Sequence, residues 1–152
     1  MACWLFKSEP ASFGIDDLAV ADRQTTGWDG VRNYQARNFL RDQVQIDDQV
    51  LFYHSGIATP GIVGIATVIR AGYPDPTAFD PASDYYDPKS RQDQPRWFAV
   101  DIRLDRKLDR TITLTELKQQ SDLQGFQLIA RGNRLSVLPV TPEQWTAILK
   151  LE

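Results

Sequence analysis

Residues 47–74, DDQVLFYHSGIATPGIVGIATVIRAGYP, contain two apolar runs separated by a short connection with glycine and proline. The first run, within residues 47–55, is rich in β-branched and aromatic side chains, which is typical of a strand. The second run, within residues 60–74, has the same character but contains Gly61 and Gly64, which mark a bulge, a corner or the close approach of another backbone. The stretch therefore predicts two strands joined by a hairpin-like connection.

Further strand patterns lie on both sides of this pair. Residues 3–10, CWLFKSEP, predict a short strand that ends at the proline. Residues 96–108, RWFAVDIRLDRKL, predict a third clear strand. In residues 126–141, FQLIARGNRLSVLPVT, the dipeptide Gly132-Asn133 separates two apolar runs, which favours a second hairpin or strand pair.

A helix is expected to begin after Asn33, because this residue type caps helix N-termini and the residues that follow have helical spacing. The polar face would hold Tyr34, Arg37, Asn38 and Arg41, and the apolar face would hold Ala36, Phe39, Leu40 and Val44. This pattern is typical of a helix docked on a core with a basic face outward. The preceding residues 27–30, Gly-Trp-Asp-Gly, form turns readily and are expected to place Trp28 on a loop.

Other helix starts are marked by capping residues. Residues 12–18 predict a short helix capped by Ser12 or Asp16. Thr113 with Glu116 forms a capping box, and Thr141 precedes a proline at the first helical position of the last helix. Between the strands, residues 72–95 are too rich in proline and aspartate for a regular element, and their aromatic side chains predict a long loop that is packed down.

The composition fits one domain over residues 1–152, with 42% hydrophobic and 24% charged residues. A single cysteine excludes a disulfide framework and favours a reducing compartment, and no apolar run resembles a signal peptide or a membrane span. We therefore expect a cytoplasmic protein without membrane contact. The strands and short helices do not alternate regularly, which predicts an α+β fold with five to six strands in a small, bent or partly closed barrel flanked by short helices.

The inventory of catalytic groups argues against an enzyme. The one histidine, His54, is next to Ser55, but neighbouring residues of a regular strand point to opposite faces and cannot form a dyad. The sequence has no phosphate-binding glycine loop, and its acidic residues lack metal-ligand spacing. We expect no metal, no cofactor and no catalysis. The net charge of −3 also excludes a general affinity for nucleic-acid backbones, so any such contact must be local.

Aromatic and isolated polar residues at strand ends suit a small-ligand or single-base pocket instead. They include Lys7, Ser8, Glu9, Asn33, His54, Ser55, Trp97 and Arg131. In addition, the motifs WLFKSEP, WDGVRNYQARN, VLFYHS, PGIVGIATV, YYDPKS, RWFAVDI and RLSVLPVT, which span nearly the whole chain, resemble the EVE domain. This family belongs to the PUA-like group, together with the YTH readers of methylated adenine and the ASCH domains.

The resemblance implies a PUA-like bent sheet and a non-catalytic pocket for a flipped-out modified base. In this pocket Trp28 matches the aromatic wall, Ser8 and Asn33 match the polar readers, and His54 and Ser55 match the floor. Lys7 and Trp97 complete the expected ligand-binding set. From charge alone, we expect Arg37, Arg41 and Arg131 to contact the nucleic-acid backbone at the rim.

The leading hypothesis is a module that recognises a modified nucleobase in DNA or RNA, with restriction-system proteins as candidate partners. One alternative is an enzyme of the ASCH type that processes nucleotides or RNA, which would need an activated nucleophile. Another is a protein-interaction domain that uses the long loop of residues 72–95 as its contact surface.

Overall fold

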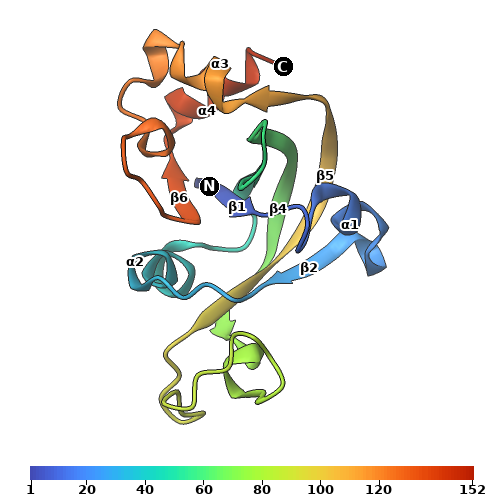
Figure 1. Cartoon of the computed structure of the whole chain (residues 1–152), viewed down its shortest axis with the longest axis vertical. Helices are drawn as coiled ribbons and strands as arrows, with labels where there is room; N and C mark the ends of the chain where they lie inside the picture. The colour runs from blue at the N-terminus through green and yellow to red at the C-terminus, as the bar shows by residue number, and fades with distance from the viewer.

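The computed structural model describes residues 1–152 and contains one mixed sheet with short helices around it (Figure 1). The strands are β1 (Cys3–Ser8), β2 (Thr25–Trp28), β3 (Gln49–His54), β4 (Gly61–Pro74), β5 (Phe98–Thr113) and β6 (Val137–Val140). The α-helices are α1 (Ile15–Val20), α2 (Tyr34–Asn38), α3 (Leu114–Lys118) and α4 (Pro142–Leu149). The predicted α+β class, with five to six strands and short flanking helices, is confirmed, and the sheet has six strands.

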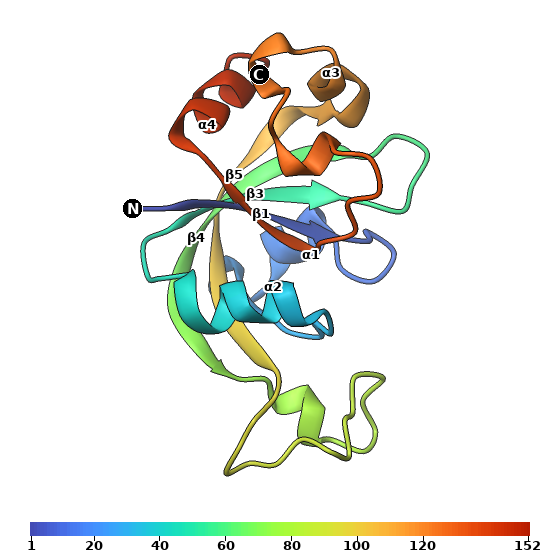
Figure 2. The ribbon, with the colours of Figure 1, turned by 90° about the vertical axis from the view of Figure 1, so that its left-hand side faces the viewer.

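The sheet has the strand order β2-β5-β4-β3-β1-β6, in which only the β1–β3 pair is parallel. Its edge strands β2 and β6 do not pair with each other, so the sheet is bent but open. The long strands β4 and β5 curve through the molecule, and the loop that joins them lies at the opposite end from α3 and α4 (Figure 2). The curvature brings β1 and β2 together, although these strands are not neighbours in the sheet.

The predicted hairpin of β3 and β4 is present, and both glycines have the expected role. A Cβ atom on Gly61 would lie 2.4 Å from the Ile112 carbonyl oxygen of β5, and one on Gly64 would lie 2.6 Å from the Ile15 side chain of α1. The register between β4 and β5 shifts between Ile62 and Gly64. Glycine therefore lets neighbouring elements approach the bent strand closely.

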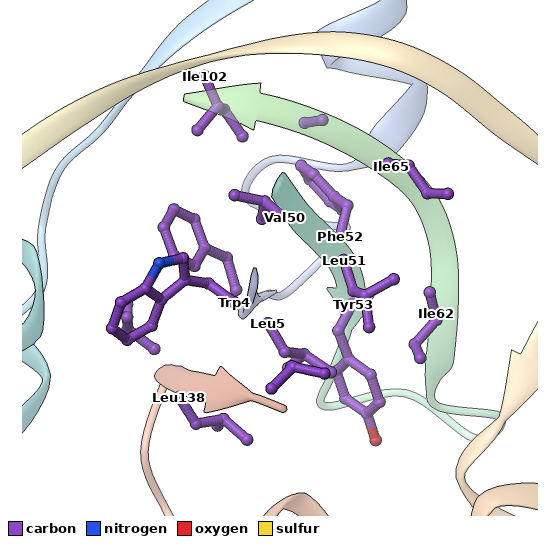
Figure 3. Close-up of a cluster of buried hydrophobic side chains, with 14 of the residues drawn as sticks. Trp4, Leu5, Val50, Leu51, Phe52, Tyr53, Ile62, Ile65, Ile102 and Leu138 are labelled. Carbon is purple, nitrogen blue, oxygen red and sulfur yellow. The ribbon is translucent and has the colours of Figure 1, made fainter. Parts of the chain in front are cut away.

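The core is centred on β1 and β3, whose side chains pack inside the curve of β4 (Figure 3). Leu5, Leu51, Phe52 and Ile62 are fully buried there. At one end of β3 the carboxylate of Asp48, only 3% exposed, accepts hydrogen bonds from the Trp4 indole at 2.9 Å, from the Gln45 amide at 2.9 Å and from the Ala2 amide at 3.0 Å. This carboxylate ties the chain start and the turn before β3 to β1.

Helix α2 begins after an Asn33 cap, as expected, and Ala36, Leu40 and Val44 are buried as the apolar face. The α-helical hydrogen bonds stop at Asn38, and residues Phe39–Gln43 continue as a π-helical turn. The capping boxes at Thr113 and Thr141 are also confirmed.

Three local predictions were wrong. Residues 126–141 do not form a hairpin, because Phe126 and Leu128 are buried through a short 3-10 turn, Gln127–Ile129, and β6 pairs with the distant β1. Helix α1 is capped by Gly14 rather than by Ser12 or Asp16, with the Asp17 carboxylate accepting from the Gly14 amide. Trp28 does not lie on a loop, since residues Thr25–Trp28 form the edge strand β2 against β5.

We expect Asp48→Ala to lower the free energy of unfolding by about 2–4 kcal/mol, because it leaves buried donors such as the Trp4 indole without an acceptor. Chemical denaturation measures the loss. Asp109→Ala, at an exposed position of β5 without side-chain hydrogen bonds, is the control and should stay within about 0.5 kcal/mol of wild type. Equal stability of the two variants would contradict the role assigned to Asp48.

Candidate functional site

A surface pocket of about 650 Å³ lies where the ends of β1 and β2 come together. Its lining comes from four parts of the chain that are distant in sequence. They are Lys7–Glu9 with Ser12 and Phe13, residues 26–32, Tyr85 of the long loop, and Ser136 before β6. The volume is within the range of small-ligand sites in proteins.

Trp28 forms the inner wall of this pocket. Its ring packs against Phe6 and Phe52, with centroid distances of 5.2 and 5.3 Å, and the residue is only 7% exposed. The contact with Phe6 joins β2 to β1, which are separated by three strands in the sheet order. Trp28 therefore belongs to the core and offers only a small part of its surface to the pocket.

The outer side of the pocket is held by an ion pair between the half-buried Arg32 and the buried Asp75. The Asp75 carboxylate is fully buried and accepts from Arg32 Nη1 at 3.0 Å and from the Gly30 amide at 2.9 Å. Burial alone would raise the pKa of Asp75, but the hydrogen bonds from Thr77, the Gly30 amide and Arg32 hold it below its ordinary value. The pair joins the segment after β2 to the loop after β4.

Arg32 also fixes Tyr85 at the rim. Its Nη2 atom donates to the Tyr85 carbonyl oxygen at 2.6 Å, and its guanidinium lies 5.5 Å from the centre of the Tyr85 ring. Gly30 has φ +74°, and a Cβ atom there would lie 2.7 Å from the same ring. The tyrosine ring thus lies against bare backbone and stays 45% exposed.

The polar groups of the pocket differ in whether they have a hydrogen-bond partner within the protein and in how their surroundings shift their pKa. The Ser8 hydroxyl donates to the Phe13 carbonyl oxygen at 2.6 Å. Lys7 is half-buried, which lowers the pKa of its ammonium group. Burial and the nearby Asp75 raise the pKa of the Asp29 carboxyl.

The structure brings Lys7, Ser8 and Trp28 together in the pocket, but the other residues expected to bind ligand lie outside its lining. The Asn33 side chain caps α2 by accepting from the Ala36 amide at 3.0 Å. Trp97 stacks on Tyr34 at 4.9 Å and donates to Asp87. A ligand contact by Asn33, Trp97, His54 or Ser55 stays a prediction from the family resemblance.

The His54 side chain connects the end of β3 to the start of α1. Its Nε2 atom accepts a hydrogen bond from the Ile15 amide at 3.0 Å, at the first turn of α1. Burial lowers the pKa of His54, and Lys107 acts in the same direction while Asp16 opposes it. The folded protein therefore favours the neutral imidazole, whose Nε2 atom can accept this hydrogen bond.

The three arginines expected at the rim are also outside the pocket lining. Arg37 donates to the Arg96 carbonyl oxygen at 2.6 Å, and Arg41 forms an ion pair with Asp42 at 2.7 Å. Arg131 is exposed in the segment between the 3-10 turn and β6. Backbone contacts by these residues stay predictions.

Sequence reasoning missed Arg32, Asp29 and Tyr85 as pocket residues. The aromatic content of the long loop did signal that the loop packs down, and Tyr85 does so. However, nothing local to Arg32 indicated a partner at Asp75, since the pair is separated by 43 residues.

The bent, open sheet and the partly polar pocket at the ends of β1 and β2 define a small α+β domain with one prominent surface site. Residues 2–151 match the family model of the EVE domain, and the chain belongs to this family. The predicted family is therefore confirmed.

Relatives are similar along almost the whole chain. Mouse thymocyte nuclear protein 1 is 43% identical over 98% of this chain and 73% of its own length. A crystal structure of a protein from Pseudomonas putida is 51% identical, with a TM-score of 0.94 and coverage of 99% of each chain. A structure of human THYN1 in complex with DNA containing 5-methylcytosine is 40% identical, with a TM-score of 0.93 over 99% of this chain and 97% of that chain.

Trp28→Ala should lower the free energy of unfolding by about 3–5 kcal/mol, because it leaves a cavity between Phe6 and Phe52. Thermal or chemical denaturation measures the effect. Trp28→Phe keeps an aromatic ring at this position and should lower the free energy of unfolding clearly less than Trp28→Ala. A Trp28→Ala variant as stable as wild type would show that the ring does not support the core.

His54 should make the protein less stable as the pH falls. Its pKa in the fold is below the ordinary 6.5, so the unfolded chain binds the proton first, and stability present at neutral pH is lost as the pH falls through this range. We expect wild type to lose more unfolding free energy between about pH 7.5 and about pH 5 than His54→Gln, which cannot titrate there. Parallel pH profiles of the two proteins would contradict the neutral imidazole.

Proposed function

We propose that this EVE domain binds DNA that carries a modified cytosine and holds the modified base in the pocket beside Trp28. The observation that carries the proposal is a pocket with an aromatic inner wall, an exposed tyrosine at its rim and unpaired polar groups inside. The human relative in complex with DNA containing 5-methylcytosine supports DNA as the ligand and this base as the modification.

The shape of the pocket suits a base that has left the helix. A protein that encloses a single base must take it out of the stack and then contacts its faces and edge. Trp28 and Phe13 lie on the inner side, and Tyr85 at the rim is free to stack on the base. Lys7 and Asp29 are available for hydrogen bonds to its edge.

We further infer that the domain binds the base without chemical turnover. The Ser8 hydroxyl donates to the Phe13 backbone carbonyl and makes no hydrogen bond to a side chain that could activate it as a nucleophile. His54 accepts from a backbone amide and does not line the pocket. These contacts favour a binding module over the alternative of an ASCH-type enzyme.

The surroundings of the pocket complete the proposal. Because the net charge is −3, the DNA backbone must be contacted by local basic groups, for which Arg37, Arg41 and Arg131 stay the candidates. No helix of the protein combines the length and apolar composition needed to cross a bilayer. A cytoplasmic location and restriction-system partners also stay predictions.

Tyr85→Ala should weaken binding to a 5-methylcytosine oligonucleotide roughly 5- to 150-fold, because stacking on an aromatic ring contributes about 1–3 kcal/mol per base. The fold should survive, since Arg32 holds the Tyr85 backbone carbonyl rather than the ring hydroxyl. Fluorescence anisotropy with labelled duplexes measures the affinities.

Tyr86→Ala is the matched control, because Tyr86 is 41% exposed, adjacent in sequence and outside the pocket lining. It should bind like wild type. Equal losses in the two variants, or wild-type protein that binds methylated and unmethylated duplexes equally, would contradict the proposed function.

A further inference from the structure

Three charged side chains in the pocket have no partner within the protein. Ser8 and Arg32 are committed to internal contacts, but Lys7, Glu9 and Asp29 take part in no ion pair and in no side-chain hydrogen bond to another residue. Lys7 can only donate, and the ionised carboxylates can only accept. The Glu9 carboxylate lies by Gly56, in the connection between β3 and β4, so Asp29, directly after Trp28, is the free acceptor beside the aromatic wall.

Lys7 and Asp29 lie at the ends of the two strands that border the pocket. Lys7 is half-buried at the end of β1, and Asp29 is exposed directly after Trp28, which ends β2. A half-buried ammonium group without an acceptor is costly, and the exposed Asp29 carboxylate is accessible to a donor. A polar ligand that offers both an acceptor and a donor would satisfy both groups.

We propose that Asp29 determines specificity by accepting a hydrogen bond from the exocyclic amino group of cytosine, while Lys7 donates to the carbonyl oxygen of the pyrimidine ring. This inference rests on the proposed function and assigns the edge contacts in the same pocket. Cytosine presents an amino donor where thymine presents a carbonyl acceptor. An acceptor at that point favours cytosine and opposes thymine.

The choice between these two bases is the main problem for a reader of 5-methylcytosine. Thymine carries a methyl group at the same ring position, so apolar contact with the methyl group cannot separate them. The exocyclic group at the pyrimidine edge does separate them, because it is an amino group in cytosine and a carbonyl in thymine. Discrimination of this kind uses a contact that is unfavourable for thymine. Asp29 supplies that contact, because its carboxylate would face the thymine carbonyl.

Asp84 provides a matched control for charge. It is exposed next to Tyr85, but it does not line the pocket and takes part in no side-chain hydrogen bond or ion pair. Asp84→Asn and Asp29→Asn remove the same charge near bound DNA. Only the second should change which base is preferred.

The test uses duplexes in which 5-methylcytosine, cytosine or thymine faces an abasic site, so that pairing energy does not enter the comparison. Fluorescence anisotropy gives each affinity. Wild type should bind 5-methylcytosine most tightly. Asp29→Asn should bind 5-methylcytosine roughly 5- to 150-fold more weakly and lose its preference over thymine, because the amide can turn its donor toward the thymine carbonyl.

Lys7→Met should weaken the binding of 5-methylcytosine and of thymine alike, because the ring carbonyl is common to both bases. Asp84→Asn should keep the wild-type ratio of 5-methylcytosine to thymine affinity. Melting temperatures verify folding, and Asp29→Ser serves as a second variant if Asp29→Asn is unstable.

The outcomes separate the two levels of the proposal. Wild type without preference for 5-methylcytosine over cytosine would overturn the proposed function and this inference with it. Wild type with that preference, but with an unchanged ratio of 5-methylcytosine to thymine affinity in Asp29→Asn and Asp29→Ser, would leave the proposed function intact and overturn the role of Asp29.

Discussion

The packing of Trp28 between Phe6 and Phe52 is the interaction on which the rest of the site depends. It joins β2 to β1 across a sheet in which three strands separate them, with ring centroids 5.2 Å apart for Trp28 and Phe6. Such a contact requires a strongly bent sheet, and Gly61 and Gly64 permit the close approaches along β4 that accompany the bend. The pocket exists because this bend brings the ends of the two strands to one place.

The second constraint acts from outside the sheet. The buried Asp75 carboxylate holds Arg32 and the Gly30 amide, and Arg32 in turn holds the Tyr85 backbone. Because removing Arg32 would leave the buried Asp75 carboxylate without its counter-charge, the long loop is fixed to the pocket rim although it contains little regular structure. One side of the site is thus built on strands and core rings, and the other side on a single polar cluster. Between these two sides, Lys7 and Asp29 keep free hydrogen-bonding groups.

Local chemistry made much of the fold predictable. The caps at Asn33, Thr113 and Thr141 and the hairpin of β3 and β4 followed from short patterns. The family resemblance indicated Ser8 and Trp28 as pocket residues, and the position of Lys7 at a strand end indicated the third. The failures involve partners that are distant in sequence. The apolar run of residues 126–141 gave no sign that β6 would pair with β1, and Arg32 gave no sign of Asp75. Trp28 could not be assigned to a strand because β2 is short and its partner β5 lies far along the chain.

The central claim is that the modified base enters the pocket between Trp28 and Tyr85. Amide and indole resonances of the isotope-labelled protein, followed by NMR during titration with an oligonucleotide containing one 5-methylcytosine, test it most directly. We expect the largest changes at Lys7, Gly30 and Tyr85, and smaller changes at the indole of Trp97, whose ring centre lies 5.1 Å from the Arg32 guanidinium but outside the pocket lining. Large changes at Trp97 or along α2, with the pocket residues unaffected, would contradict it.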